Sequence, residues 1–305
     1  MRSFVMAARH FLTLTDLTPA ELATLMARAA ELKAAHRCGE RATPYAGKVL
    51  AMLFEKSSTR TRASFEAAWT HLGGHTMFLS PRDIQLGRGE TVEDSARVLS
   101  RMVDVLVVRT FSHERLELFA AHSAVPVINA LTDRFHPCQL LADILTWIER
   151  HSDIRGRTAA FVGDGNNVCQ SWMEAARLFG FHLRVAAPNG YQPEAGLQAT
   201  YADCVQVLND PAAAVAGADA VITDVWASMG QEDEAAARVQ AFAGFQVNAA
   251  LLAQAAPGAI FMHCLPAHRG EEVSADVIDG PQSVVWDEAE NRLHAQKALL
   301  ELLLG

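Results

Sequence analysis

The sequence predicts an α/β protein with two domains, each a parallel β-sheet flanked by helices, joined by interdomain helices. The chain has 305 residues, of which 50% are hydrophobic, so it can bury more than one core. Short runs with strand character alternate with longer stretches of helical periodicity almost throughout, which is typical of parallel sheets with helical crossovers. These runs fall into two groups, with a longer helical stretch at residues 136–151 between them.

The strand-like runs predict the order of the two sheets along the chain. Four runs form the first group, at residues 48–54 (KVLAMLF), 75–80 (HTMFLS), 104–110 (DVLVVRT) and 125–130 (VPVINA). Five runs form the second group, at residues 158–164 (TAAFVGD), 183–188 (LRVAAP), 204–209 (CVQVLN), 219–226 (DAVITDVW) and 259–266 (AIFMHCLP).

The stretch between the two groups predicts the domain boundary. Its aliphatic residues recur at helical spacing, at Leu140, Leu141, Ile144, Leu145 and Ile148. We therefore expect a linking helix at residues 136–151. The first domain is expected at residues 1–135, completed by a C-terminal helix at 288–305, and the second at 152–287.

Composition excludes several classes of partner. The net charge is −9 and no basic cluster occurs, which disfavours nucleic acid or an anionic membrane. No apolar run reaches the roughly 20 residues of a membrane span, and the N-terminal residues lack the apolar core of a signal peptide, so a cytoplasmic protein is expected. The five cysteines are scattered without a CxxC pair, which indicates neither a disulfide framework nor a zinc ribbon.

Polar clusters follow six of the predicted strands. Because ligands of parallel α/β sheets bind beyond the carboxyl ends of the strands, we expect these clusters to converge on one cleft. They are SSTRTR at 57–62, Arg109, HPCQ at 136–139, GDGNN at 163–167, Asp224 in DVWASMG, and HCLP at 263–266.

The SSTRTR run predicts a phosphate cradle. Ser58, Thr59, Arg60 and Thr61 should occupy the first turn of a helix, where free backbone N–H groups and the positive end of the dipole favour an anion. Arg60 and Arg62 are two positions apart, which separates them by about 200° around the helix, so they cannot both face one ligand. Arg60 is assigned to the anion and Arg62 to a structural ion pair. The alternative is an ordinary N-cap with solvated arginines.

His136 and Gln139 begin a helix directly after a strand. Together with Arg109 they could donate to a carbonyl oxygen that becomes negative in a transition state. A structural histidine is the alternative.

The GDGNN and HCLP runs leave several interpretations open. A dinucleotide fingerprint would need glycine at Val168, so Asn166 and Asn167 could instead bind an amino acid, or only form a turn. Cys264 could be a small apolar residue or a nucleophile paired with His136 or His263, although nothing local supports the pair. A metal would need His263, Cys264, His268 and a further ligand at unfavourable spacing, so none is expected.

Taken together, the motifs resemble the aspartate/ornithine carbamoyltransferase family, and within it the anabolic ornithine enzymes, along nearly the whole chain. The runs that carry the resemblance are SSTRTR, RTFSH, HPCQ, GDGNN, DVWASMG, HCLPAHRGEEV and DEAENRLHAQ, in this order. The resemblance implies an enzyme that makes L-citrulline and phosphate from carbamoyl phosphate and L-ornithine, without metal or cofactor. It also implies a homotrimer or a multiple of trimers.

The resemblance also implies site residues. For carbamoyl phosphate they are Ser58, Thr59, Arg60, Thr61, Arg109, His136, Gln139 and Arg292, with Gln85 reaching a neighbouring subunit's site; for ornithine they are Asn167, Asp224, Ser228 and Met229; Cys264 and Leu265 border both. The catalytic residues among them are Arg109, His136, Asp224 and Cys264. Asp224 and Cys264 would orient the amine, while Thr61, Arg109 and His136 would stabilise the oxyanion.

The same residues bear on alternatives to this function. A non-catalytic member would be expected to lack Arg60, His136 or Cys264, and all three are present. A nucleotide-dependent dehydrogenase is disfavoured by Val168. HCLP together with DVWASMG favours ornithine over aspartate, N-acetylornithine or putrescine.

Cys169 and Gln170 differ from the residues expected there and could alter the wall behind Asn167.

Overall fold

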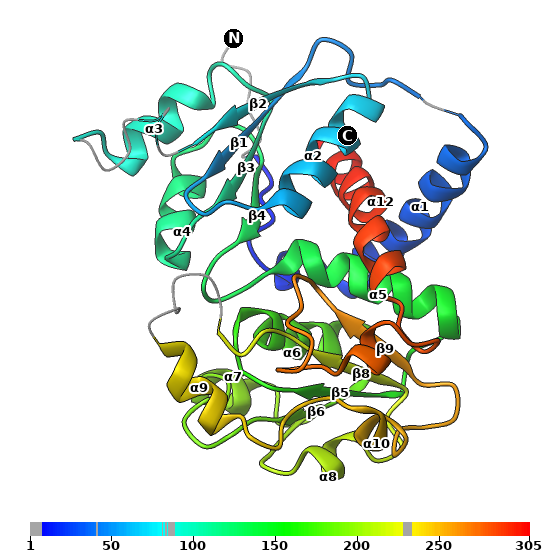
Figure 1. Ribbon diagram of the computed structural model, residues 1–305. Coiled ribbons are helices and arrows are strands. Elements are labelled where there is room, and N and C mark those ends of the chain that lie inside the picture. Colours follow the sequence, from blue (N-terminus) through cyan, green and yellow to red (C-terminus); the bar gives the residue numbers. More distant parts are fainter. Residues whose placement is uncertain (1–7, 41, 81, 83, 85–88, 228–233) are drawn as a thin grey trace. The chain divides into compact units, whose positions relative to one another are not determined.

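The computed structural model describes residues 8–40, 42–80, 82, 84, 89–227 and 234–305 (Figure 1). The chain forms two compact units. Unit 1 comprises Met1–Leu141 and Arg292–Gly305, and unit 2 comprises Ala142–Asn291. Both boundaries lie inside helices, α5 (Pro137–His151) and α12 (Val285–Leu304), rather than in loops.

Unit 1 is built on a parallel sheet in the order β2-β1-β3-β4. Its strands are β1 (Val49–Phe54), β2 (His75–Leu79), β3 (Val105–Arg109) and β4 (Val127–Leu131). Besides the start of α5 and the end of α12, its helical elements are η1 (Leu14–Asp16), α1 (Pro19–Arg37), α2 (Thr59–His71), α3 (Val92–Leu99) and α4 (His113–Ala121).

The two faces of this sheet are covered by different helices. Figure 1 shows α3 and α4 on one side and α2 on the other. The α3/α4 side buries a cluster that includes Ala51, Leu53, Leu106, Leu116 and Phe119. At about 25 cal/mol per Å² of apolar surface, burial of this kind is the main stabilising contribution to each unit.

Unit 2 contains a second parallel sheet, in the order β7-β6-β5-β8-β9. Its strands are β5 (Thr158–Val162), β6 (His182–Ala186), β7 (Val205–Leu208), β8 (Ala220–Thr223) and β9 (Ile260–His263). Its helices are α6 (Asn167–Phe179), α7 (Ala195–Thr200), α8 (Pro211–Val215), α9 (Ala235–Ala241), α10 (Ala249–Leu252) and α11 (Ala275–Ile278), together with most of α5 and the start of α12. The predicted α/β fold class and the nine predicted strands are confirmed.

The turn after α2 depends on two glycines. Phe65, Ala68 and Trp69 are buried on its inner face, and the chain leaves the helix at Gly73, whose φ is +90°. A Cβ on Gly74 would lie 2.2 Å from Nε1 of Trp69, so the turn needs glycine there. Within the described part of the chain, no helix is both long and apolar enough to span a membrane.

Candidate active site

The predicted site residues divide between the two units, and each group is described within its own unit. The cation cluster, in unit 1, comprises Ser58, Thr59, Arg60, Thr61, Arg109, His136, Gln139 and Arg292. The thiol cluster, in unit 2, comprises Asn167, Asp224, Cys264 and Leu265. Gln85, Ser228 and Met229 lie outside the described residues.

The cation cluster begins at the first turn of α2. Ser58 is the N-cap residue, and its Oγ accepts a hydrogen bond from the backbone N of Thr61 at 3.4 Å. Ser58 Oγ in turn donates to Thr61 Oγ1 at 3.0 Å. The N–H groups of Thr59 and Arg60 belong to the first turn and have no partner within the helix, an arrangement that favours a negatively charged group.

The two arginines of this helix have different surroundings. Arg62 Nε lies 2.9 Å from Glu66 Oε1, and its guanidinium lies 3.9 Å from the centre of the Phe78 ring. Arg60 is half-buried and forms no hydrogen bond or ion pair with any described residue. The structural ion pair predicted for Arg62 is therefore present, and the guanidinium of Arg60 is left available to a ligand.

Arg292 connects three helices within unit 1. Its Nη1 donates to Gln139 Oε1 in α5 at 2.7 Å, and its Nη2 donates to Thr61 Oγ1 in α2 at 3.0 Å. Arg292 itself lies in α12 and is 3% exposed. Arg109 ends β3, is also buried, and follows a register shift in the pairing of β3 with β4.

His136, just before α5, is less basic than the three arginines of the cluster. Burial lowers the pKa of its imidazole well below the usual value, and the charges of Arg292, Arg109 and Arg60 lower it further. His136 is therefore neutral near pH 7. Three guanidinium groups around a neutral imidazole favour a bound anion, and they would stabilise negative charge that develops on an oxygen.

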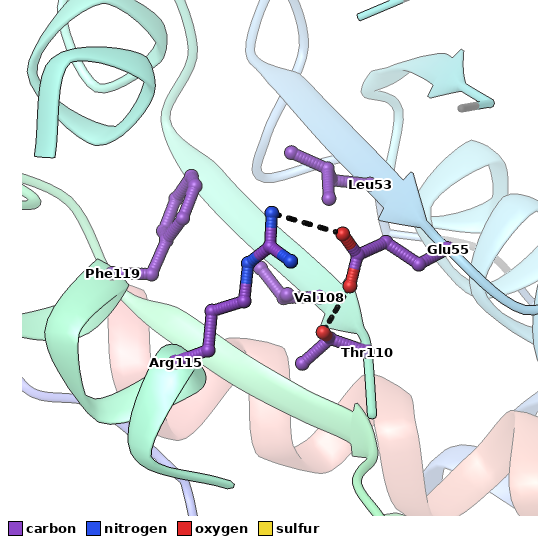
Figure 2. Close-up of a pocket in the computed structure, with 6 residues that line it drawn as sticks. All are labelled: Leu53, Glu55, Val108, Thr110, Arg115 and Phe119. Atoms are coloured by element: carbon purple, nitrogen blue, oxygen red, sulfur yellow. Dashed lines mark hydrogen bonds and ion pairs between the residues drawn. The ribbon is translucent and has the colours of Figure 1, made fainter. Parts of the chain in front are cut away.

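Glu55 and Lys56, which the sequence analysis did not select, hold the turn that leads into α2. Figure 2 shows the Glu55 carboxylate between the Thr110 hydroxyl and the Arg115 guanidinium, whose Nη2 lies 3.2 Å from Glu55 Oε1. The backbone N of Glu55 donates to the Arg109 carbonyl at 2.8 Å. Lys56 pairs with Asp133. The turn before α2 is thus fixed to the end of β3. In the sequence, the only indication of this role is that Glu55 and Lys56, two charged residues, stand directly between a strand and SSTRTR.

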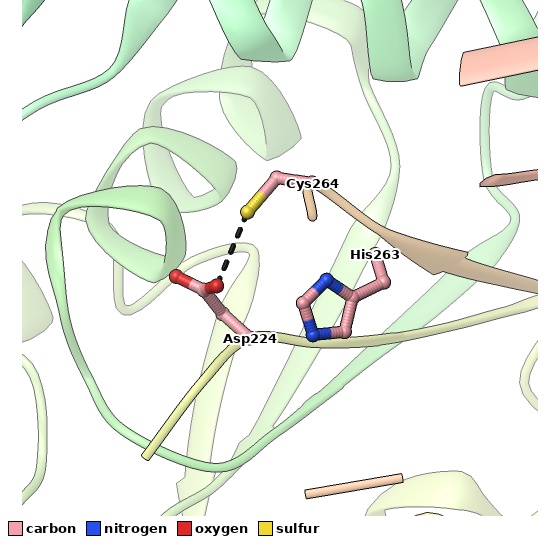
Figure 3. Close-up of side chains that lie close together, drawn as sticks. All are labelled: Asp224, His263 and Cys264. Atoms are coloured by element: carbon pink, nitrogen blue, oxygen red, sulfur yellow. Dashed lines mark hydrogen bonds between the residues drawn. The ribbon is translucent and has the colours of Figure 1, made fainter. Parts of the chain in front are cut away.

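In the thiol cluster, Asp224 and Cys264 meet at the ends of neighbouring strands. Cys264 Sγ donates to Asp224 Oδ1 at 3.1 Å (Figure 3). Asn166 Nδ2 donates to the other carboxylate oxygen, Oδ2, at 2.7 Å. Burial raises the pKa of the Cys264 thiol well above its usual value, and the Asp224 charge raises it further. A thiolate nucleophile is therefore disfavoured at this position.

His263 is occupied by other partners. Its Nδ1 accepts from the backbone N of Leu265 at 2.8 Å, which leaves the proton on Nε2, 3.2 Å from Glu272 Oε1. Leu265 has a φ of +58°, in the left-handed region. Potential ligand atoms of Asp224, His263 and Cys264 lie within 4.8 Å of one another (Figure 3). Both nitrogens of His263 are engaged and the thiol is protonated, so these donors fit a metal ion poorly.

The GDGNN residues have divided roles. Asn166 is the N-cap of α6, and its Oδ1 accepts from the backbone N of Val168 at 3.0 Å and of Cys169 at 3.1 Å. It is thus a helix cap and a partner of Asp224 at once. Asn167 is the first residue of α6 and half-buried. Cys169 is fully buried, and Gln170 Oε1 accepts from the backbone N of Glu194 at 3.2 Å.

Two protein-family models together match almost the whole chain. The model of the aspartate/ornithine carbamoyltransferase carbamoyl-P binding domain matches residues 9–149, and the model of the Asp/Orn binding domain of that family matches residues 155–303. An ornithine carbamoyltransferase of Halorhodospira halophila is 63% identical over 296 residues, which cover 97% of this chain and 99% of the relative.

Two solved structures resemble the chain closely. The ornithine carbamoyltransferase of Pyrococcus furiosus has a TM-score of 0.93 at 50% identity, over 98% of each chain. The anabolic ornithine carbamoyltransferase of Campylobacter jejuni has a TM-score of 0.90 at 41% identity, over 97% of this chain and 98% of the other.

Proposed function

This chain belongs to the aspartate/ornithine carbamoyltransferase family, and from that premise we propose that it transfers the carbamoyl group of carbamoyl phosphate to the δ-amine of L-ornithine. The products are L-citrulline and phosphate, which is a step of arginine biosynthesis. The observation that carries the proposal is the cation cluster around a neutral His136, in the part of the chain that matches the carbamoyl-P binding domain. Unit 1 would bind carbamoyl phosphate and unit 2 ornithine.

Carbamoyl phosphate fits the donors of the cation cluster. The N–H groups of the first turn of α2 and the Arg60 guanidinium would hold the phosphate. Thr61, Arg109 and His136 would donate to the carbamoyl oxygen, which becomes an oxyanion when the carbonyl carbon is attacked. Gln139 and Arg292 would complete the pocket, with Arg292 holding Gln139 and Thr61 in place. Arg60 would stabilise the phosphate as it leaves.

Ornithine presents a different requirement, because its δ-amine must be neutral to attack. An alkylammonium of this kind has a pKa of about 10.4, so only a small fraction is neutral at pH 7. The Asp224 carboxylate is an acceptor for the amine, and the protonated Cys264 thiol fixes one of its oxygens. Asn167, Ser228 and Met229 would bind the amino-acid end, while Cys264 and Leu265 would border both substrates.

The assembly and location follow the same premise. We propose a cytoplasmic homotrimer, or a multiple of trimers, in which Gln85 reaches a neighbouring site. The edge strand β2 and the α3/α4 side leave Met77, Val98, Met102 and Leu118 exposed, which suits burial against another copy. Mixing inactive Gln85→Ala and Arg60→Ala chains should regenerate some activity, because a hybrid trimer can combine two intact halves. Hybrids that remain inactive would contradict this role of Gln85.

The function is tested by phosphate release from carbamoyl phosphate with a panel of amines, together with identification of the carbamoylated product, which is L-citrulline for L-ornithine. L-Ornithine should react far better than L-lysine, putrescine, L-aspartate or N-acetylornithine, because one methylene or a missing charge misplaces the amine or leaves a polar group unpaired. Comparable turnover of N-acetylornithine would refute the choice of substrate.

A further inference from the structure

Arg238 is a buried cation that the reaction described above does not use. It lies in α9 and is 7% exposed. Its Nη1 donates to Asp164 Oδ2 at 2.8 Å and to the Trp226 carbonyl at 2.9 Å, and its Nε donates to Glu234 Oε2 at 3.1 Å. Because the guanidinium is buried, its hydrogen bonds fix both its own position and the positions of the groups that accept them.

These partners come from separate segments at one edge of the unit 2 sheet. Asp164 follows β5 in the GDGNN run, Trp226 follows β8, and Glu234 directly precedes α9. The centre of the Tyr191 ring, in the loop after β6, lies 5.0 Å from the guanidinium carbon of Arg238. The Arg238 side chain therefore contacts the segments that follow β5, β6 and β8, and also the residue before α9.

Two of these segments determine where the Asp224 carboxylate lies. Trp226 is two residues after Asp224 on the same segment, so the Arg238–Trp226 bond fixes the chain that carries Asp224. Asp164 is two residues before Asn166, whose side chain donates to Asp224 at 2.7 Å. Asp224 is thus held both from its own segment and from the GDGNN run.

The GDGNN run transmits position because it is tightly packed. The backbone N of Gly165, between Asp164 and Asn166, donates to the Tyr191 carbonyl at 2.8 Å. A Cβ on Gly165 would lie 2.2 Å from the backbone N of Pro193. A shift of Asp164 must therefore move Asn166 as well.

We propose that Arg238 is a positioning residue for the amino-acid substrate, which fixes the GDGNN run and the segment after β8 so that Asp224 meets the amine. The inference rests on the proposed function, which takes that substrate to be L-ornithine and assigns its amine to Asp224. Loss of Arg238 should weaken the use of ornithine and leave carbamoyl phosphate binding, which belongs to unit 1, nearly unchanged.

The Asp164–Arg238 pair should also respond to pH. Burial raises the pKa of Asp164 to about 6 although Arg238 opposes the shift, and the charges of Asp224 and Glu234 raise it further. Below that pH Asp164 takes up a proton and Arg238 loses an anionic partner. The KM for ornithine should therefore show an additional rise as the pH falls through about 6.

The test compares Arg238→Gln, Arg238→Lys and a control, Arg155→Gln, whose ion pair with Asp153 lies on the surface of the same unit. Arg238→Gln should raise the KM for ornithine about tenfold or more, with the KM for carbamoyl phosphate within about twofold of wild type. Arg238→Lys should recover part of the loss, and Arg155→Gln should behave as wild type. Thermal melts of each variant distinguish a loss of folding from a shift of Asp224 in a folded protein.

The pH response is tested with Asp164→Asn, in which the additional rise near pH 6 should be absent. An unchanged KM for ornithine in folded Arg238→Gln, or equal rises in both KM values, would overturn the inference. Should Arg238→Gln fail to fold, the Arg238→Lys and Asp164→Asn values decide by the same criteria. The proposed function is judged separately, on citrulline formation by the wild type. Calorimetric titration with L-ornithine measures the ratio of variant to wild-type affinity without turnover.

Discussion

Thr61 accepts two hydrogen bonds, one from Ser58 and one from Arg292, a residue 231 positions later in the chain. A hydroxyl oxygen has two acceptor positions and one proton to donate. Both acceptor positions are filled, and no described residue accepts the Thr61 proton, so the hydroxyl can act toward a ligand only as a donor. Arg292 thus makes Thr61 a donor, which is the role an oxyanion requires.

Thr61→Val should remove this donor while keeping the shape of a fully buried side chain. We expect kcat to fall by about 10²–10³-fold, as for other lost oxyanion donors, whereas Thr61→Ser should retain most activity. Steady-state kinetics with carbamoyl phosphate as the varied substrate measures both effects. Activity of Thr61→Val within threefold of wild type would mean that the hydroxyl has a structural role only.

Arg60→Ala and Arg62→Ala should have separate effects. Arg60→Ala should abolish most activity, because a charged hydrogen bond to the phosphate is worth about 1.5–3 kcal/mol in binding and more in the transition state. Arg62→Ala should cost about 1 kcal/mol of stability, from an exposed ion pair with Glu66 and contact with the Phe78 ring. Kinetics and thermal melts of the two variants, run in parallel, distinguish the roles. A fully active Arg60→Ala enzyme contradicts the phosphate assignment.

His136 should make stability depend on pH in a defined direction. Its folded pKa is depressed by burial and then by Arg292, Arg109 and Arg60, so below about pH 6.5 the unfolded chain binds a proton that the folded protein does not. Its contribution to the free energy of unfolding is therefore fully present above about pH 6.5 and is lost as the pH falls. Between about pH 7.5 and 5.5, the Tm of the wild type should fall more than that of His136→Gln. Parallel curves would mean that the imidazole is protonated in the folded state.

Asp224→Asn should act on ornithine alone. We expect kcat/KM for ornithine to fall by about 10²-fold, because the amide replaces one acceptor oxygen of a carboxylate that both Asn166 and Cys264 contact. The KM for carbamoyl phosphate should stay within about twofold of wild type. In the wild type, kcat/KM for ornithine should rise with pH toward the amine pKa of about 10.4. Equal losses for both substrates would indicate that Asp224 supports the fold.

The sequence predicted what depends on local order along the chain. Strand runs such as residues 104–110 and the start of α2 at Ser58 follow from periodicity and capping chemistry between near neighbours. The contact of Arg238 with Asp164 joins residues 74 positions apart, and that of Arg292 with Gln139 joins residues 153 apart. No local pattern specifies such pairs, so Arg238 and Glu55 were missed and Asn166 was not foreseen as a cap.

The discontinuity of unit 1 bears on how the protein is made. Residues 292–305 are synthesised after the whole of unit 2, roughly 150 residues later than Leu141, which is about 8 to 30 s at ordinary translation rates. During that interval Ser58 and Thr61 can already stand at the start of α2, but Arg292 has not emerged to orient the Thr61 hydroxyl. A nascent chain on the ribosome would therefore complete unit 2 before unit 1, although unit 1 begins first along the chain.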